Sequence, residues 1–217
     1  MTAACFARWC ATIGAAPRVQ ADMAARPPAD AIVTLRSMER RWRHLLAPDG
    51  PDDQRRHDAA HTITSDGHSP LDHLAAATRT FIFHGRALEQ TLIDDEPLLH
   101  PGVADPAERE WPPAEGTVVE QLAELAWASD HLATRATHVE ADAWRRIGRV
   151  AGHPSVTPSA LALLWQAVDA GVDHLRAAER GLAEALPPPV GTLLPAQFAP
   201  FEHPPIRGVV TAKRWAT

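Results

Sequence analysis

The sequence predicts an all-α protein built on a four-helix bundle. Four segments repeat apolar residues in steps of three and four, which is the spacing of one helix face. Proline-rich stretches separate these segments, and we find neither strand-like alternation nor an Asn-Gly hairpin signal. Because a helix with one apolar stripe must bury it against another element, four such helices pack most economically as a bundle.

The first helix is expected over residues 30–47. Pro27 and Pro28 precede it, and Asp30 is a suitable N-cap. Its stripe consists of Ile32, Leu35, Met38, Trp42, Leu45 and Leu46. The polar stretch 49–66 that follows predicts a loop.

The second helix has the clearest beginning. Ser69 is an N-cap residue, Pro70 suits the first helical position, and Asp72 stands where a capping-box acid belongs. The apolar periodicity fades at residues 94–97. Residues 98–113 therefore form a long connection that contains several prolines.

The third and fourth helices begin with similar signals. Thr117 and Glu120 form a capping box, and the third helix is expected to reach residue 146. Residues 148–154 interrupt the pattern. Thr157 followed by Pro158 predicts the start of the fourth helix, which ends at the prolines 187–189.

Length and composition indicate one domain with two extensions. The 217 residues divide into an arm (1–28), the bundle (29–187) and a Pro-rich tail (188–217). The tail keeps large apolar side chains that disordered tails usually lack, so we expect it to pack on the bundle.

Charge and hydropathy limit the partners. The net charge of −6 argues against a general nucleic-acid binder, and no apolar run approaches the roughly 20 residues of a membrane helix. Cys5 and Cys10 are too few for a disulfide framework, which favours a cytoplasmic location. The sequence contains no P-loop, dinucleotide fingerprint, HExxH motif or nucleophile elbow.

Four short motifs at the helix ends resemble those of the DinB/YfiT-like superfamily: Ser69-Pro70-Leu71-Asp72, Asp94-Asp95-Glu96-Pro97, Ala141-Asp142-Ala143-Trp144 and Val172-Asp173-His174-Leu175. The resemblance covers residues 30–184. It implies a four-helix bundle with a divalent metal at one end. It also implies a small-molecule substrate and a low-molecular-weight thiol, because members include thiol-dependent S-transferases and maleylpyruvate isomerases.

The resemblance also implies metal ligands from two helices. In the family, one His of the second helix and a pair spaced four residues apart on the fourth hold the ion. Those positions fall on Ala76, Ala170 and His174, so only His174 matches, because alanine cannot coordinate a metal.

A register shifted by one residue gives a different donor set. Asp169 and Asp173 then form a carboxylate pair, and His73 lies one turn before the family position. His73, Asp169, Asp173 and His174 would favour Mg, Mn or Fe(II). Plain solvated carboxylates are the alternative for both aspartates, so the sequence leaves one bound divalent ion and none both open.

Three histidines are candidate catalytic residues. His73 and His84 share a helical stripe with small residues, and they line either an interior pocket or a polar helix edge. His174 lies near the apolar stripe of the fourth helix as a ligand, an acid–base group or a hydrogen-bonded core histidine. A separate stripe of Trp127, His131 and His138 is either surface or a contact with the tail or with a second subunit in a homodimer.

These features predict a divergent DinB-like small-molecule enzyme of the transferase, isomerase or lyase type, with its pocket in the bundle. The alternative is a non-catalytic binding or dimerisation module whose metal site has decayed.

Overall fold

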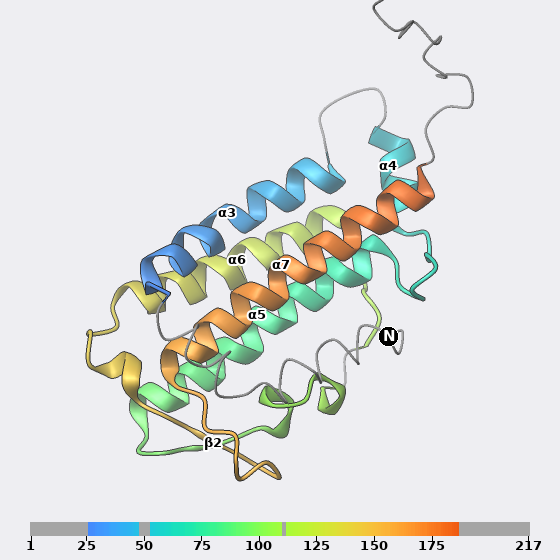
Figure 1. The fold of residues 1–217 in the computed structure, drawn as a ribbon. Helices are drawn as coiled ribbons and strands as arrows, with labels where there is room; N and C mark the ends of the chain where they lie inside the picture. The colour runs from blue at the N-terminus through green and yellow to red at the C-terminus, as the bar shows by residue number, and fades with distance from the viewer. Residues whose placement is uncertain (1–25, 48–52, 110–111, 187–217) are drawn as a thin grey trace, which may run out of the picture. The chain divides into compact units, whose positions relative to one another are not determined.

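The computed structural model describes residues 26–47, 53–109 and 112–186. The helices α3 (Pro28–Leu46), α5 (Pro70–Ile93), α6 (Val118–Thr137) and α7 (Ala160–Ala185) lie side by side (Figure 1). The all-α prediction is confirmed for this part of the chain. The tail (188–217) and nearly all of the arm (1–28) lie outside the described residues.

The apolar stripe of α3 is buried as predicted. Ala31, Leu35, Met38, Trp42 and Leu46 all face the core, where α3 packs against α6. The predicted loop after it is wrong in part, because a short helix, α4 (Asp53–Ala60), forms there. Its sequence carries no apolar stripe, and burial of Ala59 and Ala60 against the core stabilises it instead.

Both predicted capping boxes form. The Ser69 hydroxyl accepts a hydrogen bond from the Asp72 N–H at 3.1 Å, and the Asp72 carboxylate accepts one from the Ser69 N–H at 2.9 Å. Thr117 and Glu120 make the same reciprocal pair at the start of α6. Each box satisfies two backbone donors that a helix end otherwise leaves without a partner.

Two predicted boundaries are wrong. Helix α6 ends at Thr137 rather than at residue 146, and a 3₁₀ turn, η3 (Ala143–Arg145), buries Trp144 beyond it. Helix α7 is capped by Ser159, whose hydroxyl accepts from the Ala162 N–H, and not by Thr157. In both cases tertiary contacts and a nearby competing cap decided the boundary.

The connections between the helices carry a small parallel ladder that the sequence did not predict. Strand β1 (Leu98–Leu99) pairs with β2 (Arg149–Val150), and the 3₁₀ turns η1 (Pro101–Val103) and η2 (Pro106–Glu108) follow β1. A second apolar cluster forms where these connections cover α5 and α7: Ala87, Leu99, Val103, Ala104, Val150 and Leu163.

Helices α5 and α7 are antiparallel neighbours in close contact. Pro70 lies beside Gly181, and Phe81 lies beside Gly171. A Cβ atom added at Gly171 would be only 2.5 Å from the Phe81 ring, so the absent side chain makes this approach feasible. The described helices include none that is long and apolar enough to cross a membrane.

Candidate functional site

His73 and His174 meet between α5 and α7. Their Nδ1 atoms are 3.5 Å apart and their ring centroids 5.8 Å apart, although 101 residues separate them in the chain. The His73 side chain is only 11% exposed. The structure therefore brings together two of the three predicted catalytic histidines.

Asp66 extends this pair, and the sequence analysis did not find it. Its Oδ2 atom is 3.0 Å from His73 Nε2, and its Oδ1 atom accepts from the Thr64 hydroxyl and the His68 N–H. A carboxylate that accepts from Nε2–H leaves the lone pair of neutral His73 on Nδ1, facing His174. We call this arrangement the Asp66–His73–His174 chain.

The surroundings keep both imidazoles of the chain neutral. Burial lowers the pKa of His73, while the hydrogen bond and charge of Asp66 oppose that shift. Burial, together with the charges of His73 and Arg109, lowers the pKa of His174 to about 3. For Asp66, burial raises the pKa, but the hydrogen bonds from His68, His73 and Thr64 outweigh it and the net shift is downward.

The third predicted histidine, His84, lies elsewhere on α5. It is 2% exposed, and its Nε2 atom is 3.2 Å from a terminal nitrogen of Arg109, which comes from the connection after α5. Burial, with the charge of Arg109, lowers the pKa of His84 well below its usual range. Burial also lowers the pKa of Arg109 to about 10, and the charge of Asp105 opposes that shift.

The hydrogen-bond roles at His84 follow from the chemistry of arginine. A guanidinium has no acceptor, so His84 Nε2 must accept and the proton of the neutral ring must sit on Nδ1. That Nδ1 atom is buried and has no hydrogen-bond partner. Such an unmade bond costs about 1–3 kcal/mol, so an apolar side chain would serve stability better here.

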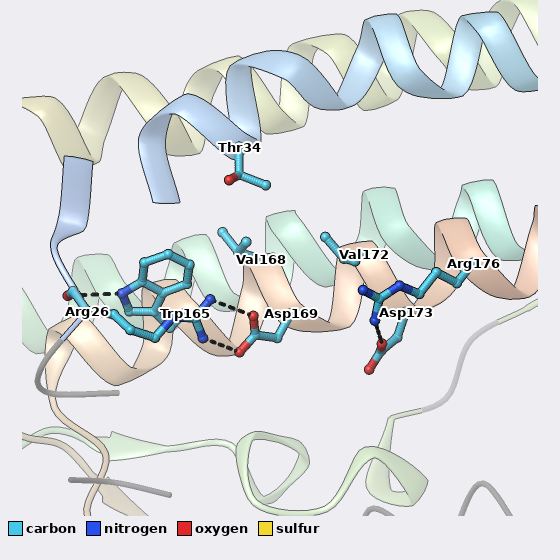
Figure 2. Close-up of a pocket in the computed structure, with 8 residues that line it drawn as sticks. All are labelled: Arg26, Thr34, Trp165, Val168, Asp169, Val172, Asp173 and Arg176. Carbon is cyan, nitrogen blue, oxygen red and sulfur yellow. Dashed lines mark hydrogen bonds and ion pairs between the residues drawn. The ribbon is translucent and has the colours of Figure 1, made fainter. Parts of the chain in front are cut away.

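The expected metal donors do not come together. Asp169 pairs with Arg26 at 2.7 Å, and Asp173 pairs with its helix neighbour Arg176 at 3.5 Å. Figure 2 shows both carboxylates in a groove of about 460 Å³ lined by Arg26, Thr34, Trp165, Val168, Asp169, Val172, Asp173 and Arg176.

The residues present therefore do not fit a divalent ion of the family type. Ala76 and Ala170 offer no ligand atom, and the second nitrogen of His73 is engaged by Asp66. Across residues 26–47, 53–109 and 112–186, no three or more His, Cys, Asp or Glu side chains are gathered in a way that could hold a metal.

The separate stripe on α6 is at the surface. Trp127 is 61% exposed, and its indole stacks on the His131 ring at 5.2 Å. His138 is exposed at the C-cap of α6. Neither a described contact nor a groove here identifies a partner for this surface.

Comparison of the chain with known families, with characterised proteins and with solved structures gives no match. The functional argument therefore depends on the geometry of the site.

Proposed function

We propose that the chain is a small-molecule enzyme with a DinB-like four-helix bundle, and that the Asp66–His73–His174 chain moves the proton in its reaction. The observation that carries this proposal is the sequence of contacts at 3.0 Å and 3.5 Å that joins a carboxylate to two nearly buried imidazoles. A carboxylate behind an imidazole orients the ring and stabilises the imidazolium that forms when the ring takes a proton.

This arrangement suits reactions of the transferase, isomerase or lyase type. In each of them a base removes a proton from a carbon next to a carbonyl, or from a thiol that then attacks as the thiolate. The proposal requires no metal, since an imidazole performs the proton transfer.

A direct test uses proton exchange in D₂O. The full chain is incubated with small 2-oxo acids, with and without a low-molecular-weight thiol, and ¹H NMR follows exchange next to the carbonyl and thioether formation. We expect exchange above the buffer rate, and a loss of about 100-fold or more in His73→Ala and His174→Ala. His44→Gln is the matched control, because His44 is an exposed histidine on α3.

The second candidate function is a non-catalytic binding module. The low pKa of His174, about 3, favours it, because so weak a base is poorly matched to neutral pH. Exchange by the wild type that is no faster than exchange by the His73→Ala and His174→Ala variants would contradict the enzyme and support this module.

A further inference from the structure

Arg109 is held in one orientation by three different elements. Its Nε–H donates to the Gly102 carbonyl in η1 at 2.6 Å, and a terminal N–H donates to His84 on α5. Its guanidinium carbon lies 4.7 Å from the centre of the Phe83 ring. A guanidinium fixed in this way loses little further freedom when it binds a ligand.

The fold makes room for the stem of this side chain. A Cβ atom at Gly102 would lie 2.8 Å from Arg109 Cγ and 3.0 Å from His100 Nδ1. Only glycine therefore allows η1 to pass so closely under the arginine. The buried Nδ1–H of His84, which lacks a partner, is a second sign that this arrangement does not serve stability alone.

Arg109 belongs to the same electrostatic environment as the Asp66–His73–His174 chain. Its charge is one of the causes that depress the pKa of His174, and it remains partly exposed to solvent. A bound anion would counter this positive charge and make His174 a stronger base. The weakness of His174 as a base is thus a property of the unliganded site.

We propose that Arg109 binds the carboxylate of the substrate beside His73 and His174, and that His84 is the positioning residue for Arg109. This inference rests on the proposed function and names its substrate class, a small carboxylic acid. The planar guanidinium matches a carboxylate with two parallel N–H donors, whereas a neutral amide offers only one acceptor oxygen.

The first experiment measures binding with acetate as the probe. NMR follows the Arg109 Nε–H and His174 ring resonances of the full chain during titration with acetate or with its neutral analogue acetamide. We expect saturable shifts with acetate, and an affinity at least ~10-fold weaker in Arg109→Gln, with a smaller loss in Arg109→Lys. Arg135→Gln is the matched control, because Arg135 lies on α6 and pairs with Glu89. Equal binding of acetate and acetamide, or unchanged acetate binding by Arg109→Gln, overturns the inference.

The second experiment separates positioning from folding. In His84→Gln, the amide oxygen lies near the position of Nε2 and can accept from Arg109, whereas His84→Leu offers no acceptor. We expect His84→Leu to fold with equal or greater stability yet to bind acetate ~10-fold more weakly, with partial recovery in His84→Gln. If acetate affinity is the same in both variants as in the wild type, His84 has no positioning role.

The outcomes also separate this inference from the proposed function. His73→Ala and His174→Ala should lose proton exchange but keep acetate binding. Acetate binding that depends on Arg109 without any exchange would contradict the enzyme and leave the anion site standing. Exchange that Arg109→Gln leaves unchanged would contradict the anion site and leave the enzyme standing.

Discussion

At the scale of single residues, the environment of each imidazole decides what it can do. His73 keeps a carboxylate at one nitrogen and another histidine at the other. His84 has a cation at one nitrogen and no partner at the other. The two residues share a helix and a stripe, so only their neighbours distinguish a proton carrier from a positioning group.

Asp66→Asn tests the link between this carboxylate and His73. Both the hydrogen bond and the charge of Asp66 raise the pKa of His73 against the effect of burial. We expect the pKa of His73 to fall further in the variant, as measured by ring ¹H–¹⁵N shifts against pH. Asp130→Asn, an exposed change on α6, should leave that pKa in place. A His73 pKa that rises or stays constant in Asp66→Asn would contradict the assignment.

At the scale of elements, two helical glycines have different roles. Gly171 on α7 faces the Phe81 ring, which is itself buried in the core, and an added Cβ has no room there. Gly85 on α5 has only Leu132 Cδ1 near, at 3.8 Å, which is ordinary contact. The spacing of α5 and α7, and hence the meeting of His73 and His174, depends on the first glycine and not on the second.

Gly171→Ala should destabilise the protein by about 1–3 kcal/mol, because Phe81 and its helix must shift to admit the methyl group. Gly85→Ala should stabilise it by about 0.5–1 kcal/mol, because alanine restricts the unfolded chain and fits without strain. Urea unfolding measures both changes. Equal effects in the two variants would show that the α5–α7 approach does not limit the side chain at position 171.

At the scale of the whole molecule, the buried histidines link stability to pH. The folded pKa values of His73, His84 and His174 all lie below the ordinary value of 6.5. The unfolded chain therefore binds more protons than the folded chain below pH 6.5, and stability falls as the pH falls. For His174 this loss continues down to about pH 3.

Removing one of these histidines should flatten the acid limb of the stability curve. Each histidine that stays neutral in the fold contributes a slope of about 1.4 kcal/mol per pH unit. We expect His174→Leu to reduce the slope between pH 6 and pH 4 by about that amount, as measured by urea unfolding at several pH values. His44→Gln should preserve the wild-type slope, and a wild-type slope in His174→Leu would mean that His174 titrates alike in both states.

The sequence by itself determined the features that depend on near neighbours. The capping boxes of Ser69 and Thr117 and the buried stripe of α3 follow from residues three or four positions apart, and the structure confirms them. Helix α4 and the early end of α6 could not be predicted in this way. Burial of Ala59, Ala60 and Trp144 against distant residues decided them.

The site shows the same division. Sequence spacing found His73, His84 and His174, because helical stripes reveal which polar residues border a core. Only the tertiary structure decided that His73 meets His174, that Asp66 joins them and that Arg109 reaches His84. Asp66 and Arg109 lie in connections, where no periodicity marks a residue, and a contact across 101 residues depends on how two helices pack rather than on either helix alone.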